Sequence, residues 1–96
     1  MRDLDLLTLR LFAAVCEQRS ITRVAEQESI VGSAISKRLA QLEDAVSTPL
    51  LVRKRLGVLP TPARETLLEH ARTMLASVAQ IERDMAAYAT GIRGHV

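Results

Sequence analysis

The sequence predicts a mainly α fold: three short helices, a small two-stranded wing and a long C-terminal helix. Three observations carry this prediction. Apolar residues recur at helical spacing through most of residues 5–46. A second apolar series continues at helical spacing after Pro62. Between the two series, Pro49 and Pro60 enclose a stretch that favours a short hairpin.

Composition indicates one ordinary globular domain. The chain has 96 residues, the usual size of one domain, and 48% of them are hydrophobic, which disfavours disorder. No apolar run approaches the roughly 18 residues of a membrane span, so we expect no membrane contact. The one cysteine, Cys16, excludes an internal disulfide and suits a reducing cytoplasm, where we expect the protein to act.

The first two helices are predicted at residues 5–19 and 23–28. Asp3 and Asp5 are plausible N-terminal caps of the first helix, and Ser20 and Thr22 offer caps to the second. Cys16 follows Phe12 on the apolar face of the first helix, so we interpret it as a core residue. Residues 30–32 interrupt the helical pattern and predict a turn.

The third helix, predicted at residues 33–46, has two different faces. One face is aliphatic and consists of Ile35, Leu39, Leu42 and Val46. The opposite face is small, polar and basic and consists of Ser33, Ser36, Lys37, Ala40 and Asp44. Small side chains permit the close approach of another surface, and Lys37 supplies positive charge there.

Positive charge is concentrated around the predicted hairpin. Residues 37–64 hold six basic and two acidic side chains, although the whole chain has a net charge of only +2. Three of the basic residues, Arg53, Lys54 and Arg55, lie near the hairpin tip. This concentration indicates a localised contact with a polyanion, although a solvated surface would give the same count.

The last helix is predicted from Pro62 to about Tyr88 or Thr90, with Thr61 as its cap. Apolar residues alternate at spacings of three and four, the pattern of a coiled-coil seam. The seam consists of Leu67, Ala71, Met74, Val78, Ile81, Met85 and Tyr88. We expect its first part to pack on Leu9 and Phe12 and its far part to dimerise. The alternative is an ordinary amphipathic helix packed on its own core.

Linked motifs then carry a family resemblance that runs without gaps from about Leu6 to Ala79. These motifs are SITRVAE at 20–26, SAISK at 33–37, LE at 42–43, PLLVR at 49–53 and PTPA at 60–63. Together they resemble the N-terminal DNA-binding domain of LysR-type bacterial transcriptional regulators. The resemblance implies a winged helix-turn-helix domain over 1–60, with the helix-turn-helix at about 21–40 and the wing at about 50–60. It also implies a dimerising linker helix over 61–90.

Residues 91–96 resemble the hinge that leads to the effector-binding domain of such regulators. We therefore expect a regulator cut at its hinge, with any small-molecule effector bound in the absent C-terminal domain and no cofactor in this chain. The resemblance implies sequence-specific binding of double-stranded DNA by a symmetric homodimer on an inverted-repeat site, with a tetramer as an alternative for the full-length protein. The DNA-contacting positions that it implies, completed by Arg55 from the basic cluster, are Thr22, Gly32, Ser33, Ala34, Ser36, Lys37, Arg53, Arg55 and Thr61.

Four residues depart from the family pattern: Glu28, Val31, Gly32 and Arg64. We expect Glu28 to turn outward and leave Ile30 to fill the core. Because Val31 cannot cap a helix, we expect Ser33 to become the cap of the third helix. The unusual start of that helix slightly favours an alternative function, a winged-helix protein-interaction or dimerisation module with weak or non-specific DNA binding.

Catalysis and metal binding have no support in the sequence. Ser36 has no histidine partner at a spacing that would suggest an activated nucleophile. His70 and His95 are far apart and lack further ligands at metal-binding spacing. The sequence therefore predicts neither an enzyme nor a metal site.

Overall fold

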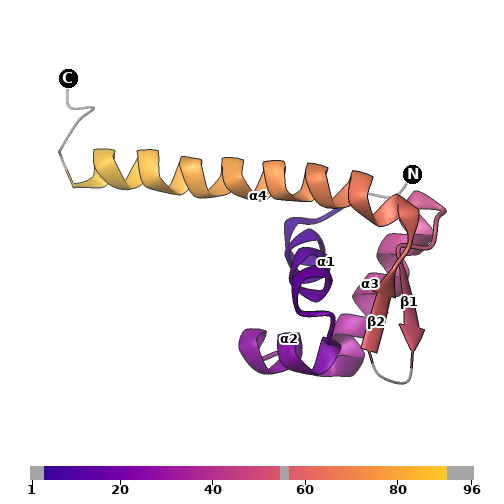
Figure 1. Ribbon diagram of the computed structural model, residues 1–96. Coiled ribbons are helices and arrows are strands. Elements are labelled where there is room, and N and C mark those ends of the chain that lie inside the picture. Colours follow the sequence, from indigo (N-terminus) through magenta and orange to yellow (C-terminus); the bar gives the residue numbers. More distant parts are fainter. Residues whose placement is uncertain (1–3, 55–56, 91–96) are drawn as a thin grey trace.

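The computed structural model describes residues 4–54 and 57–90 and, outside residues 53–60, their side chains. The elements in chain order are α1 (Leu6–Gln18), α2 (Ile21–Glu28), α3 (Gly32–Val46), β1 (Leu51–Lys54), β2 (Gly57–Pro60) and α4 (Pro62–Ala89). Figure 1 shows α4 lying across one end of α1, with α2 at the other end and α3 and the hairpin beside them. The predicted fold class, a mainly helical winged helix-turn-helix with a long C-terminal helix, is confirmed.

The first two helices begin where side chains cap them. The carboxylate of Asp5 accepts hydrogen bonds from the backbone N–H of Thr8 at 2.7 Å and from its hydroxyl at 3.0 Å. These bonds lower the pKa of the Asp5 carboxyl group, because they stabilise its charged form. The hydroxyl of Ser20 accepts from the N–H of Arg23 at 3.1 Å, so α2 begins two residues before the predicted start. The other proposed cap of α1, Asp3, lies outside the described residues.

An aliphatic core joins the three short helices to α4. Its largest fully buried side chains are Phe12, Leu9, Leu11, Ile35, Leu50, Val15 and Val24. Cys16 is buried among them, as the sequence predicted, and burial raises the pKa of its thiol to about 11. The thiol therefore stays protonated at neutral pH and serves packing.

The wing is attached to α3 through one carboxylate. Its strands pair antiparallel, with Leu51 opposite Pro60 and Lys54 opposite Gly57. Glu43 of α3 accepts hydrogen bonds from the N–H groups of Leu50 at 2.6 Å and Leu51 at 3.1 Å. Leu50 is itself buried in the core. The base of the wing is thus fixed against α3 by both a polar and an apolar contact.

The two halves of α4 have different surroundings. In the first half, Leu68 and Ala71 are buried against the core. In the second half, Ile81, Met85 and Tyr88 are about half exposed or more, at 59%, 58% and 49%. Figure 1 shows this second half projecting beyond the rest of the chain. Among the described residues, no helix has the length and apolar character needed to cross a membrane.

Candidate nucleic-acid interface

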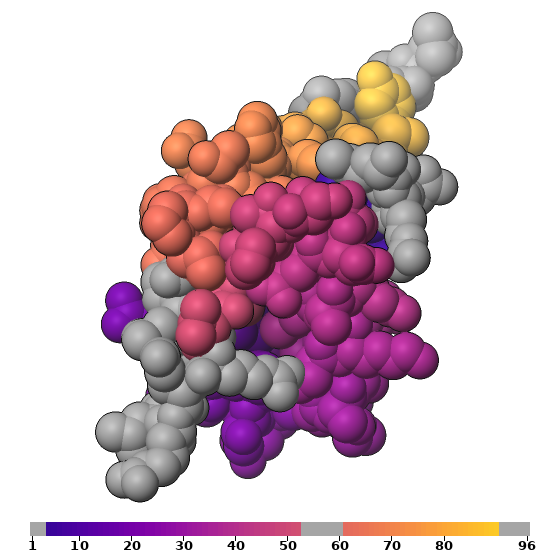
Figure 2. All heavy atoms as spheres, turned by 90° about the vertical axis from the view of Figure 1, so that its right-hand side faces the viewer, coloured from indigo at the N-terminus to yellow at the C-terminus, as the bar shows by residue number. Residues whose placement is uncertain are grey.

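The candidate site lies on the side of the molecule opposite α4. There the chain brings together α2, the start of α3 and the ends of the two strands (Figure 1). The packing of α2 on α3 fixes the angle between them, and the Glu43 contacts fix the base of the wing. Figure 2 shows α3 occupying much of the face turned to the viewer. An exposed helix flanked by a second helix and a wing is the arrangement that places a recognition helix in the major groove.

The exposed face of α3 is small and polar, as the sequence predicted. Ser33, Ala34, Lys37, Ala40 and the acidic Asp44 are exposed along it. Ser36 is half-buried and lines a cavity together with Ile21 of α2 and Leu51 of β1. Between Ser33 and Ala40, the face outside that cavity therefore presents the positive Lys37 among small side chains that let a partner approach closely.

The expected capping of α3 by Ser33 is wrong. The helix begins at Gly32 with Val31 as the capping residue, and no side chain caps its first turn. Ser33 already lies inside this turn, where its hydroxyl cannot accept from the N–H groups that a cap would satisfy. The uncapped N–H groups at the start of α3 are available to an acceptor outside the chain, such as a phosphate.

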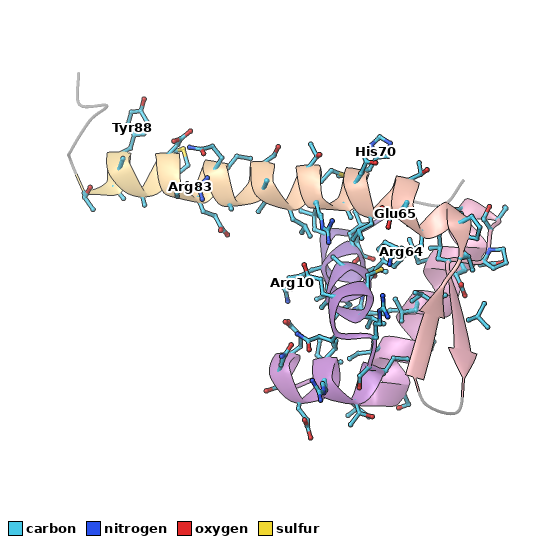
Figure 3. The ribbon with its side chains drawn as sticks, in the orientation of Figure 1. Arg10, Arg64, Glu65, His70, Arg83 and Tyr88 are labelled. Carbon is cyan, nitrogen blue, oxygen red and sulfur yellow. The ribbon has the colours of Figure 1, made fainter. Side chains whose placement is uncertain are left out.

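Two of the six basic residues counted between 37 and 64 make contacts within the domain. Arg38 lies 3.5 Å from the carboxylate of Asp5 and donates a hydrogen bond to the Thr8 hydroxyl at 3.2 Å. Arg64 is 15% exposed and pairs with Glu65. Figure 3 shows Arg64 directed into the space between α4 and the rest of the domain. The number of basic residues between 37 and 64 therefore overstates the positive charge available to a partner. Of the two basic residues in α3, Lys37 is the exposed one.

The threonines proposed as phosphate contacts differ. Thr22 is exposed at the second position of α2. The hydroxyl of Thr61 donates to the carbonyl of Pro49 at 2.6 Å, so its proton is already engaged. Thr61 also precedes α4 without capping it through its side chain, contrary to expectation. Arg53 lies in β1 opposite Val58, whereas its side chain and the whole of Arg55 fall outside the described residues.

The departures from the family pattern are accommodated locally. Glu28 forms an ion pair with Arg10 at 3.2 Å, which explains why a carboxylate is tolerated there. Ile30 is half-buried and packs against the core, as expected. Gly32 leaves room on its α2 side, because a Cβ atom built on it would meet only the Ile21 side chain, at 3.8 Å. A side chain at position 32 is therefore sterically possible.

The apolar seam predicted on α4 is covered by its own domain at one end and mostly exposed along the rest. Ala71 is fully buried in its own domain and Leu67 partly so, which makes Ala71 unavailable to a second chain. Farther along, Met74, Ile81, Met85 and Tyr88 are exposed and Val78 is half-buried. Figure 3 shows Tyr88 on the side of α4 turned away from α1. Residues 91–96, interpreted as a hinge, lie outside the described residues.

The sequence analysis gave no role to Glu43, because the structural role of its carboxylate depends on a contact between α3 and the wing rather than on a motif. The resemblance quoted Leu42 and Glu43 together, yet gave no role to the carboxylate. Its two bonds to the start of the wing hold the wing beside the exposed face of α3. In the described part of the chain, no group of His, Cys, Asp and Glu residues is placed to hold a metal ion.

Comparison with known proteins identifies related chains. The sequence model for bacterial regulatory helix-turn-helix proteins of the lysR family matches residues 6–65. The small neutral protease regulatory protein of Streptomyces coelicolor is 32% identical over 89 residues, which are 93% of this chain and 27% of that protein. The HTH-type transcriptional regulator DgdR of Burkholderia cepacia is 34% identical over 95 residues, which are 99% of this chain and 32% of that protein.

Solved structures show the same fold. The chain superimposes on BenM DBD in its complex with catB site 1 DNA with a TM-score of 0.86 at 29% identity, covering 97% of this chain and 100% of that one. It superimposes on the C206S mutant of Corynebacterium glutamicum OxyR with a TM-score of 0.82 at 28% identity, covering 98% of this chain and 29% of that one. The chain spans about a quarter to a third of the length of the curated relatives it matches.

Proposed function

The chain belongs to the lysR family of bacterial regulatory helix-turn-helix proteins, and we propose that it binds double-stranded DNA with sequence specificity. The observation that carries this proposal is the start of α3. Its first turn is uncapped, and Ser33, Ala34 and Lys37 are exposed beside it. In helix-turn-helix proteins this part of the recognition helix contacts base edges in the major groove. The family consists of regulators, and the chain is accordingly not an enzyme.

The wing and α2 supply contacts with the DNA backbone in this proposal. Thr22 lies exposed at the start of α2, where a hydroxyl and the helix N-terminus both suit a phosphate. Arg53 of β1 and Arg55, which the sequence predicts near the hairpin tip, would contact phosphates or the minor groove. Such contacts fix the register of α3 on the duplex without reading sequence.

We further propose that the chain acts as a symmetric homodimer on an inverted-repeat site in the bacterial cytoplasm. The exposed part of the α4 seam supports this proposal. Ile81 and Met85 are 59% and 58% exposed, so covering them would gain more than half of the roughly 1.5–3 kcal/mol that full burial of such a side chain contributes. A second copy of α4 would cover them. Two-fold symmetry would then place two copies of α3 in successive major grooves.

Selection of binding sites from a random pool of duplex DNA tests the proposal. We expect recovery of an inverted repeat and a steep loss of affinity with increasing salt, because phosphate contacts release counterions. Recovery of a single, unrepeated half-site would contradict the symmetric dimer. Weak binding without sequence enrichment would instead favour the interaction-module alternative.

A further inference from the structure

Neither burial of apolar side chains nor helix capping explains why a valine occupies position 31. At 72% exposed, it is the most exposed large apolar side chain of the described residues. It also serves as the capping residue of α3, a position at which Ser, Thr, Asp or Asn stabilise a helix and Val does not. Val31 therefore contributes neither burial nor capping. A residue that breaks two local rules without a structural gain is a candidate for function.

Apart from Ser33, the residues next to Val31 at the exposed start of α3 lack polar side chains. Gly32 follows it directly, and the exposed Ala34 lies in the first turn of the helix that Val31 precedes. Neither the Val31 nor the Ala34 side chain can donate or accept a hydrogen bond, and Gly32 has no side chain. Base reading at positions 31 and 34 must therefore use apolar contact, whereas the exposed Ser33 can use its hydroxyl. The positive charge of Lys37 lies one turn farther along the same exposed surface.

The major groove presents one strongly apolar group, the C5-methyl group of thymine. We propose that Val31, supported by Ala34, reads a thymine methyl group in each half-site, which makes Val31 a specificity-determining residue. This inference rests on the proposed function, because it assumes that the start of α3 enters the major groove. Val31 is 72% exposed, so most of its side chain is open to pack against the thymine methyl group.

The test uses the full chain and the duplex site selected with it. Each thymidine of one half-site is replaced in turn by deoxyuridine, which removes the methyl group and keeps the hydrogen-bonding edge. We expect one replacement to weaken binding about fourfold, the value of one methyl-sized contact removed from water. Every other replacement should have a smaller effect.

Variants of Val31 assign that loss to its side chain. Val31→Ala removes both methyl groups and is as poor a cap as Val, so helix stability is matched. In this variant, the ratio of affinities for thymidine and deoxyuridine at the sensitive position should fall to about one. Val31→Thr keeps one methyl group and should retain part of the ratio.

The possible outcomes distinguish the inference about Val31 from the proposed sequence-specific DNA binding on which it rests. Sequence-specific binding in which no thymidine is sensitive to deoxyuridine would overturn the reading by Val31 and leave the proposed function standing. Sensitivity that is unchanged in Val31→Ala would assign the methyl contact to another residue and overturn the inference equally. Absence of specific binding to any duplex would overturn the proposed function and the inference with it.

Discussion

The exposed face of α3 and the far half of α4 are both left uncovered by the fold, but they differ in chemistry. From Ser33 to Ala40 the α3 face carries small side chains and one cation, Lys37, and its first turn is uncapped. The far half of α4 carries large apolar side chains such as Ile81 and Met85. The first surface suits a polyanion that must approach closely, and the second suits another apolar helix. The comparison teaches that exposure alone does not identify a partner, whereas the chemistry of the exposed residues does.

Ile81→Asp should have the largest effect on dimerisation and DNA affinity, because it places a charge in the apolar surface of α4. In a dimer the new carboxylate would be buried without a partner, which disfavours association. The core should remain folded, since Ile81 is 59% exposed and lies beyond it. Affinity for the selected inverted repeat should fall by about 100-fold or more, as two linked half-site contacts become independent. Sedimentation and DNA titration at equal protein concentration measure both effects.

Ala76→Asp is the matched control for this change. Ala76 is also exposed on α4, but a five-residue separation places it on the side of the helix opposite Ile81. This variant should keep the oligomeric state and the DNA affinity of the wild type. A wild-type protein that sediments as a monomer, or equal behaviour of the two variants, would show that the far half of α4 does not dimerise.

Lys37→Ala tests the other surface. We expect a loss of about 1–3 kcal/mol in DNA binding if Lys37 reads a base edge, with no change in oligomeric state. The neighbouring Arg38→Ala is the matched control, because Arg38 already contacts Asp5 and Thr8. It should lower the free energy of unfolding slightly and leave DNA affinity nearly unchanged. If Arg38→Ala costs more DNA affinity than Lys37→Ala, the assignment of the exposed face is wrong.

The sequence predicted the helices well because each prediction rested on local signals. Helical spacing, the caps Asp5 and Ser20, and Pro62 at the start of α4 act within a few residues of one another. The start of α3 was harder to predict, because Val31 offers no capping signal and the next polar residue, Ser33, is already inside the helix. The fold there is set by packing of α3 on its neighbours rather than by a cap.

Contacts between elements could not be read from the sequence. The basic count between 37 and 64 included Arg38, whose partners Asp5 and Thr8 lie at the start of another helix and reach it only through the fold. Glu43 counted only as an acidic residue, although its carboxylate holds the wing. A similar limit applied to α4, where the regular seam did not reveal that Ala71 is covered by its own domain. Periodicity shows which residues share a face and does not show what covers that face.

Glu43→Ala tests whether α3 and the wing act as one surface. The change leaves the N–H groups of Leu50 and Leu51 without their acceptor, which should cost about 1–3 kcal/mol of unfolding free energy. Affinity for specific and random DNA should fall together, because a displaced wing loses contacts with the DNA backbone. Glu43→Gln keeps an acceptor oxygen and should lose less of both. Chemical denaturation and DNA titration provide the two measurements, and an unchanged free energy of unfolding in Glu43→Ala would argue against the carboxylate as an anchor.

The smallest effect on affinity is expected at Gly32, where only the reading of sequence should change. The Ile21 side chain lies 3.8 Å from a Cβ atom built at this position, an ordinary contact, so Gly32→Gln should fold normally. Its amide group can form paired hydrogen bonds with adenine in the major groove, so one base position of the selected site should shift toward adenine. Gly32→Ala adds the Cβ atom without the amide and should select the wild-type site. Parallel selections with the three proteins make the comparison. Identical sites for all three would show that position 32 does not reach the bases, and would restrict reading by α3 to its other exposed residues.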